Sequence, residues 1–267
     1  MELKSYKWNA QDYAKHSSGQ FEWAQELIAK LGLQGSESIL DIGCGDGKIT
    51  QRLAEAAKDG TVLGIDQSEE MIRMALEQFP PEKYPNLAFL RMNAMDIHLS
   101  QKFDVAFSNA TLHWVEDQVA ALRGVHESLK PGGKILFQMG GRGNAAEVFV
   151  AIEKLLQREE WQPYYEDFTP PYHFCARREY KAWLRETGFR PVRVDLLPKD
   201  MQHHGVEGFK GWLRTTWFPY TDCLPAQLRA AFLSELAETY LLEHPVDANG
   251  NIHVKMVRLE VEAYALK

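Results

Sequence analysis

The sequence predicts an α/β fold built on a doubly wound, mostly parallel sheet of seven strands, with helices on both faces. Short apolar runs alternate with amphipathic stretches of helical length through the first half of the 267 residues. A glycine-rich turn follows the first of these runs. Strands separated by helices of about 10–15 residues are typical of βαβ units. In such sheets ligands bind at the carboxyl ends of the strands.

The first half supplies five of the expected strands. They are short, apolar and bounded by turn residues, at 38–42, 61–65, 87–92, 103–107 and 134–139. A helix is expected at about 48–58, after the glycine turn. A second helix follows Ser68, which suits an N-cap, and its first residues Glu69 and Glu70 suit the positive end of a helix dipole.

The second half predicts two further strands and a helical cover. A helix at 177–187, ended by Gly188, precedes a strand at 192–197, and the last strand is expected at 252–266. Helices are expected at 206–216 and 225–243; the latter carries a core-facing stripe of Leu228, Phe232, Leu236 and Tyr240. Segments 6–31, 142–174 and 203–245 are interpreted as covers on a core of 36–139, 176–200 and 252–266, within a single domain of residues 1–267.

Composition and charge exclude several classes of protein. Hydrophobic residues make up 45% and the net charge is −7, with no basic run. Nucleic-acid and anionic-membrane partners are therefore not expected. Neither a secretory signal nor an apolar run of about 18 residues is found. Three scattered cysteines and the isolated pair His203-His204 predict neither a disulfide framework nor a metal site. A cytoplasmic protein is the expectation.

The glycine turn between the first strand and its helix reads Asp41-Ile42-Gly43-Cys44-Gly45-Asp46-Gly47. It departs from a dinucleotide fingerprint because its third glycine comes one residue early. It departs from a P-loop because Lys48 is followed by Ile49 rather than Ser or Thr. Glycines at such a turn allow close approach of a ligand to the backbone.

Two acidic residues define the expected ligand. Asp41 ends the first strand, where a carboxylate would repel a pyrophosphate but suit a cation. Asp66 ends the second strand and can accept hydrogen bonds from both hydroxyls of a ribose. A cation, a close backbone approach and a ribose together describe S-adenosyl-L-methionine.

At these residues the chain resembles the class I S-adenosylmethionine-dependent methyltransferases, which have a Rossmann-like fold. The resemblance covers about 36–139 and rests on four motifs in order: the glycine turn, Asp66, the step Asn93-Ala94, and the strand 103–109 with the turn 129–133. It implies that the cofactor is bound by Asp41, Gly43, Cys44, Gly45, Gly47, Asp66, Gln67, Asn93, Ala94, Met95 and Asn109. Asp96 competes with Asn93 for the adenine.

A narrower resemblance concerns the methyl acceptor. Stretches 8–13, 108–114 and 137–139 are similar to the trans-aconitate methyltransferases, while Tyr13, Gln20 and 112–115 are similar to the juvenile hormone acid methyltransferases. Both families methylate carboxylates of small molecules. The N-terminal pattern is also shared with the malonyl-carrier-protein methyltransferases. An acyl carboxylate on a carrier protein, a phenol, an amine and a non-catalytic S-adenosylmethionine-binding protein remain alternatives, as does a nicotinamide-dependent oxidoreductase.

The candidate catalytic and substrate residues follow the fourth and fifth strands. His113 and Trp114 are expected to line the active site, Tyr13 and Gln20 to form a lid, and Arg142 to clamp an acidic substrate. A carboxylate acceptor is already ionised at pH 7 and needs no base. His113 is nevertheless a candidate base. Six aromatic residues form either a packed loop or a pocket wall: Trp161, Tyr164, Tyr165, Phe168, Tyr172 and Phe174.

Overall fold

The computed structural model describes Asp12 and residues 18–266. The chain forms two compact units. The sheet unit comprises Gln20–Arg142, Tyr172–Leu197 and the chain from Arg258 onward. The helical unit comprises Gly143–Pro171, Pro198–Val257 and the described residues up to Gly19. The prediction of a single domain stays a prediction.

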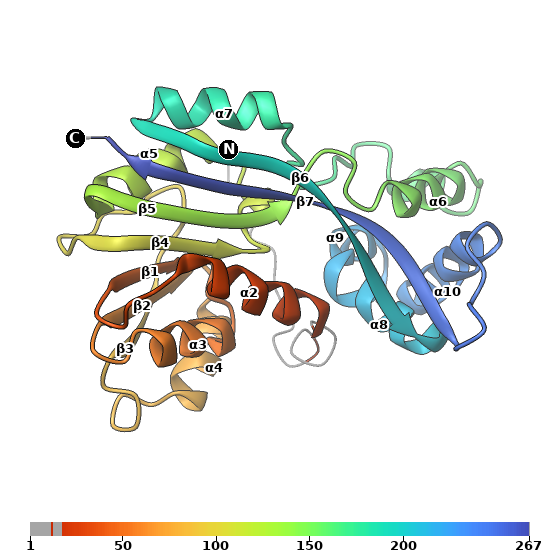
Figure 1. The fold of residues 1–267 in the computed structure, drawn as a ribbon. Coiled ribbons are helices and arrows are strands. Elements are labelled where there is room, and N and C mark those ends of the chain that lie inside the picture. Colours follow the sequence, from red (N-terminus) through yellow and green to blue (C-terminus); the bar gives the residue numbers. More distant parts are fainter. Residues whose placement is uncertain (1–11, 13–17, 267) are drawn as a thin grey trace. The chain divides into compact units, whose positions relative to one another are not determined.

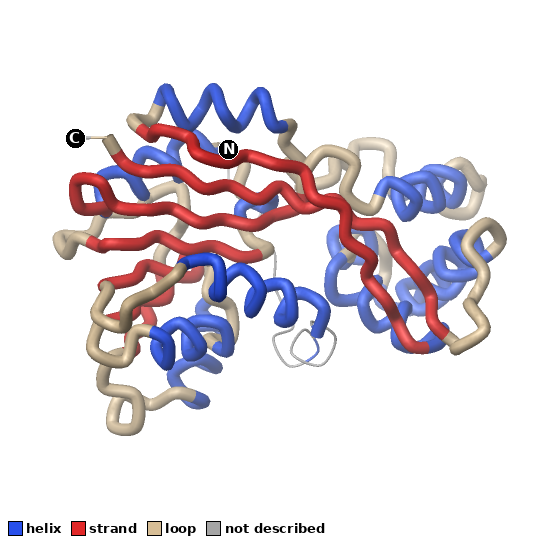
Figure 2. The backbone as a smooth tube through the Cα atoms, viewed as in Figure 1, coloured by secondary structure: helices blue, strands red, loops and turns tan. Residues whose placement is uncertain are grey.

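The sheet unit carries the predicted seven-stranded sheet, in the order β3-β2-β1-β4-β5-β7-β6 (Figure 2). Strands β1 to β5 run parallel and β7 is antiparallel to β5. The strands are β1 (Ser38–Ile42), β2 (Thr61–Asp66), β3 (Leu87–Arg91), β4 (Phe103–Asn109), β5 (Leu129–Gly140), β6 (Phe189–His204) and β7 (Asn251–Ala265). The order reverses between β1 and β4, so their carboxyl ends form the crevice in which such sheets bind ligands.

Helices cover both faces of this sheet, as predicted (Figure 1). Alternate residues of each buried strand point to opposite faces. On one face the strands pack against α2 (Ser18–Leu31) and α3 (Lys48–Ala56), through Leu27 and Leu53. On the other face they pack against α5 (Gln118–Ser128) and α7 (Arg177–Glu186), through Val125 and Leu184. Helix α4 (Glu69–Gln78) begins after Ser68, whose hydroxyl caps the N–H of Met71 as expected.

The helical unit has an aromatic core. Its helices are α6 (Ala146–Leu156), α8 (Gly205–Thr216), α9 (Phe218–Asp222) and α10 (Ala226–Leu241), with a short turn η2 (Gln162–Tyr164). Trp161 is fully buried and packs edge-to-face on Phe232 of α10, at 5.2 Å between ring centroids. The Tyr165 hydroxyl donates to the carbonyl of Tyr220. Trp161 and Tyr165 therefore behave as parts of a packed loop. The predicted covering role of these helices stays a prediction.

Strand β6 differs most from its prediction. The sequence indicated 192–197, whereas β6 spans Phe189–His204 and includes Pro191 and Pro198. These prolines read as strand limits, but β6 lies at the edge of the sheet, where a missing N–H costs no ladder hydrogen bond. The turn 130–133 also lies within β5, as an irregularity in its register with β4. No helix among the described residues is long and apolar enough to cross a membrane.

Candidate functional site

The glycine turn joins β1 to α3 and is held against the end of β2. The backbone N–H groups of Gly43 and Cys44 both donate to the carbonyl of Ile65. Gly43, Gly45 and Gly47 all have positive φ, at 75°, 53° and 83°. A Cβ at Gly43 would lie 2.1–2.5 Å from side-chain atoms of Thr111, whereas a Cβ at Gly45 would meet no atom within 4 Å. Gly45 therefore exposes backbone that a ligand can approach closely.

Asp41 lies buried beneath this turn. Only 2% of its surface is exposed, and one carboxylate oxygen accepts a 2.8 Å hydrogen bond from the hydroxyl of Thr50. Burial raises the pKa of Asp41 to about 7, Thr50 lowers it and the nearby charge of Asp66 raises it. A buried carboxylate with one hydrogen-bond donor would be stabilised by a cationic ligand. Thr50 was not predicted from the sequence.

Asp66 connects the glycine turn to the start of α4. Its two oxygens accept hydrogen bonds from the backbone N–H of Gly45 at 3.1 Å and of Ser68 at 2.8 Å. Desolvation raises the pKa of Asp66, and these two bonds act against that rise. The carboxylate thus has a fixed orientation beside Gly45. Two acidic groups and an open glycine, brought together by β1 and β2, fit a ligand with a cation and a hydroxylated sugar. The exposed Gln67 follows directly.

The predicted adenine residues follow β3. The Asn93 side chain accepts a 2.9 Å hydrogen bond from the backbone N–H of Met95, which closes a tight turn. Asn93, Ala94 and Met95 are half-buried, whereas Asp96 is exposed. The backbone of this turn is therefore fixed by Asn93 itself. Its contact with adenine stays a prediction.

The end of β4 is strained and closely packed. Asn109 is buried, and Ala110 has a φ of 57°, which is uncommon for a residue other than glycine. Its N–H donates to the carbonyl of Gln138 at 2.8 Å. Strained backbone of this kind gathers at functional sites. The hydroxyl of Thr111, which the sequence did not predict, donates to the carbonyl of Gly43 and ties this exit to the glycine turn.

His113 and Trp114 follow in the turn η1 (Leu112–Trp114), where aromatic side chains meet. His113 is buried and lies 5.6 Å from the ring of Phe174, and Trp114 packs edge-to-face on Tyr172. The backbone N–H of Gly140 donates to Nδ1 of His113 at 3.3 Å. Burial, and then the charge of Arg258, hold the pKa of His113 well below its usual value. His113 is therefore a neutral imidazole.

The structure does not test the predicted lid, and it leaves the side chain of the predicted clamp residue exposed. Tyr13 lies outside the described residues, and Gln20 is described only as backbone of α2. Arg142 follows β5, and its backbone N–H donates to the carbonyl of Cys175, but its side chain is exposed. The Cys44 thiol is buried and its pKa is raised by that burial, so it is a packing group rather than a nucleophile.

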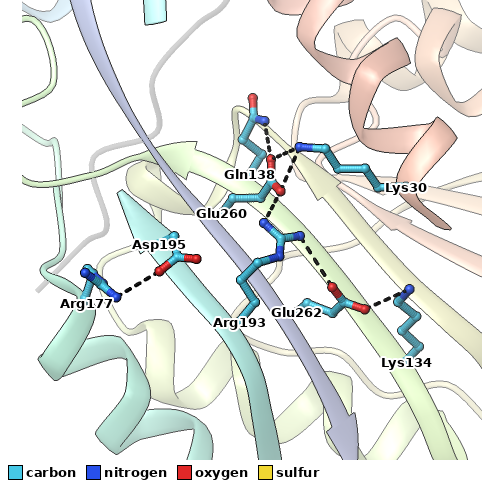
Figure 3. A network of polar contacts seen from close by, with 8 residues as sticks. All are labelled: Lys30, Lys134, Gln138, Arg177, Arg193, Asp195, Glu260 and Glu262. Atoms are coloured by element: carbon cyan, nitrogen blue, oxygen red, sulfur yellow. Dashed lines mark hydrogen bonds and ion pairs between the residues drawn. The ribbon is translucent and has the colours of Figure 1, made fainter. Parts of the chain in front are cut away.

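A buried ionic cluster forms where β7 runs beside the carboxyl end of β5, and the sequence did not predict it (Figure 3). Glu260 is fully buried and pairs with Lys30 at 2.9 Å, with Arg193, and with the amide of Gln138 at 3.2 Å. Arg258, two residues earlier on β7, is also buried and lies over the ring of Trp23. The sequence signal was the charge at every second position, 258, 260 and 262, in a part of the strand whose intervening residues are apolar.

The fold and this site define a class of protein. A parallel sheet with one antiparallel strand, an acidic glycine turn after β1 and an acid after β2 are typical of nucleoside-binding α/β enzymes. The acid under the turn distinguishes this site from a pyrophosphate site.

Comparisons with known proteins identify the family. A family described as a methyltransferase domain matches residues 33–188. The chain is 29% identical to an uncharacterised methyltransferase of Schizosaccharomyces pombe over 81% of this chain and 90% of that one. It is 27% identical to trans-aconitate 2-methyltransferase of Methylobacterium nodulans over 94% and 96%.

Among solved structures, phosphoethanolamine N-methyltransferase 2 of Haemonchus contortus, in complex with S-adenosylhomocysteine, has a TM-score of 0.60 at 18% identity. The superposition includes 97% of this chain and 57% of the Haemonchus chain. The chain belongs to the S-adenosylmethionine-dependent methyltransferases, and S-adenosylmethionine is its cofactor.

Proposed function

We propose that the enzyme transfers the methyl group to a carboxylate oxygen of a small organic acid. S-adenosylmethionine supplies an electrophilic methyl group when bound. The acceptor oxygen forms the new bond to the methyl carbon as the carbon–sulfur bond breaks, and the electron pair leaves on sulfur. The products are a methyl ester and S-adenosylhomocysteine. A carboxylate is ionised at pH 7, so no proton has to be removed.

The hydrogen bond from Gly140 to His113 supports this proposal most directly. A backbone N–H can only donate, so Nδ1 carries no proton and the proton of the neutral ring lies on Nε2. The ring can therefore donate a hydrogen bond through Nε2, but it can take up a proton only by losing the bond to Gly140. Its lowered pKa makes it a weak base as well. Such a histidine suits an acceptor that needs a donor, such as a carboxylate, better than one that needs a base.

The cofactor residues have separate roles in this proposal. The buried carboxylate of Asp41 would stabilise the positive charge of the methionyl part, and Asp66, beside the open backbone of Gly45, would accept hydrogen bonds from the ribose hydroxyls. Asn93 fixes the turn that receives the adenine. Positioning of the acceptor against the methyl group supplies the largest rate effect, roughly 7–11 kcal/mol. The resemblance to trans-aconitate 2-methyltransferases supports an acid as the acceptor.

The test is methyl transfer from tritium-labelled S-adenosylmethionine to matched pairs of acceptors. Each carboxylic acid, trans-aconitic acid among them, is compared with its amide, which keeps the shape and loses the nucleophile. Phenols and amines complete the panel. We expect label only in acids. Transfer to phenols or amines, at a rate that falls below about pH 7 and loses that dependence in His113→Ala, would favour a base mechanism and contradict the proposal.

A further inference from the structure

Gln138 lies near the carboxyl end of β5, in a row of residues that runs across the sheet from the glycine turn. Its direct partners are Asn109 on β4 and Glu260 on β7. The hydroxyl of Thr111 lies 3.1 Å from the carbonyl oxygen of Gly43 and 3.2 Å from that of Asn109, so the end of β4 is tied to the turn. Neighbouring strands are about 4.8 Å apart, so Gln138 stands one strand beyond this junction. That is the side of the cofactor turn on which the methyl acceptor is expected.

The side chain of Gln138 has a fixed orientation. Its amide nitrogen donates to a carboxylate oxygen of Glu260 at 3.2 Å (Figure 3). Burial raises the pKa of Glu260, but the bonds from Lys30 and Arg193 lower it by more, so the group is a carboxylate. A carboxylate can only accept hydrogen bonds. The amide nitrogen therefore has to face Glu260, and the amide oxygen points away from it.

The amide oxygen of Gln138 has no hydrogen-bond partner among the residues that the structure describes. The side chain is also buried, with 1% of its surface exposed. Most buried polar groups in proteins are hydrogen-bonded, and leaving one unpaired is costly. An amide oxygen can only accept, so the missing partner is a donor.

The surroundings of this oxygen favour a neutral donor. Glu260 already faces two cations, so an ammonium group at Gln138 would bring a third positive charge close to them. A hydroxyl donates without adding charge. His113 is bonded to the backbone N–H of Gly140, two residues further along β5, and its own proton lies on Nε2. The end of β5 is thus bordered by one donor for a carboxylate and one acceptor for a hydroxyl.

We propose that the amide oxygen of Gln138 accepts a hydrogen bond from a hydroxyl group of the methyl acceptor, which makes the acceptor a hydroxy acid and Gln138 a specificity-determining residue. This inference rests on the proposed function. The carboxylate of the acceptor attacks the methyl carbon and the hydroxyl takes no part in the transfer. Its bond to Gln138 selects acids that carry a donor and orients them at the end of β5.

The test is calorimetric binding of matched acids to the protein saturated with S-adenosylhomocysteine. Three pairs differ only in one hydroxyl: malic and succinic acid, citric and tricarballylic acid, and 3-hydroxyoctanoic and octanoic acid. We expect the wild type to bind the hydroxy acid of at least one pair roughly 10-fold more tightly than its deoxy partner. The methyl ether of that hydroxy acid should bind no better than the deoxy acid, because an ether oxygen cannot donate.

A pair of variants assigns this preference to one side chain. Gln138→Met removes the amide and keeps the length of the side chain, so it should lose the preference while binding of the deoxy acid changes little. The matched control is Lys134→Met. Lys134 lies on the same strand and face, four residues earlier, and pairs with Glu262 at 3.0 Å. It should keep the wild-type preference.

Equal binding of the hydroxy and deoxy acids by the wild type in every pair would overturn the assignment, and so would a preference that survives in Gln138→Met. Should Gln138→Met not fold, the wild-type comparison of hydroxy acid, deoxy acid and ether decides the question. Methyl transfer to the same acids separates the two proposals. Transfer to both acids of each pair with equal kcat/KM would overturn this inference and leave the proposed function standing, whereas transfer to phenols or amines but to no acid would contradict the proposed function itself.

Discussion

Gly43 and Gly45 belong to the same turn, but replacing each by alanine should have a different effect. Gly43→Ala should lower stability, and Gly45→Ala should weaken cofactor binding. In Gly43→Ala the new Cβ would lie 2.1–2.5 Å from Thr111, whose hydroxyl is bonded to the carbonyl of Gly43 itself. Thr111 is β-branched and cannot easily turn away. In Gly45→Ala the new Cβ would enter open space. The first substitution perturbs the fold, and the second perturbs whatever binds at the turn.

The expected magnitudes follow from the backbone and the contacts. Positive φ costs an alanine about 1–2 kcal/mol at either position. Gly43→Ala adds overpacking of about 1–3 kcal/mol, so its loss of unfolding free energy should reach roughly 2–5 kcal/mol. Gly45→Ala should lose only the strain of about 1–2 kcal/mol. Its Cβ would instead displace bound S-adenosylhomocysteine, and roughly a 10-fold or greater loss of affinity is expected.

Urea unfolding and calorimetric titration of S-adenosylhomocysteine measure these two effects separately. The urea midpoint should move most in Gly43→Ala, at an unchanged m-value. The dissociation constant should rise in Gly45→Ala while the protein remains folded at 25 °C. Wild-type affinity in Gly45→Ala would show that the cofactor does not approach this backbone. Equal stability of the two variants would refute the steric role of Thr111.

Three further predictions concern charged groups. Because the pKa of Asp41 is raised to about 7, the folded protein binds a proton more tightly than the unfolded chain between about pH 4 and 7. Stability without cofactor should therefore fall as pH rises through this window, and affinity for S-adenosylmethionine should rise. Both dependences should be smaller in Asp41→Asn, where Asp66, whose pKa is also raised, still contributes; denaturation and calorimetry measure them. Burial alone would raise the pKa of Glu260, but bonds from Lys30 and Arg193 outweigh it and hold the pKa below its ordinary value. Glu260→Gln should thus lose about 1–3 kcal/mol at pH 7 and less at pH 3, and equal losses at both values would argue against the ion pairs. With saturating cofactor and a carboxylate acceptor, turnover should stay nearly flat from about pH 6 to 8, and His113→Ala should lower it without adding a pH dependence.

The sheet and the glycine turn were predictable because their signals are local. Five short apolar runs, three of whose four connections contain an α-helix, indicate the parallel strands, and Asp41 to Gly47 are contiguous in sequence. The length of β6 was not predictable from Pro198, since a proline limits a central strand but is tolerated at an edge.

The buried cluster could not be found in the same way. Glu260 meets Lys30 across 230 positions of sequence, and Arg258 meets Trp23 over a similar span. Such pairs depend on where β7 inserts between β5 and β6, and no local periodicity encodes that insertion. Thr50 was not predicted for a related reason. In the sequence it is an ordinary residue of a helix, and only the packing of that helix on β1 brings its hydroxyl to the carboxylate of Asp41.

The chemistry of the methylated product tests the central claim most directly. After incubation of the wild-type enzyme with labelled S-adenosylmethionine and trans-aconitic acid or another carboxylic acid of the panel, the product is isolated and treated with mild base. A methyl ester is cleaved by base and releases labelled methanol, together with the original acid. We predict that mild base releases all of the label from the product as methanol. Label that stays on a base-stable ether or amine, or that never leaves S-adenosylmethionine with any acid of the panel, would contradict the account.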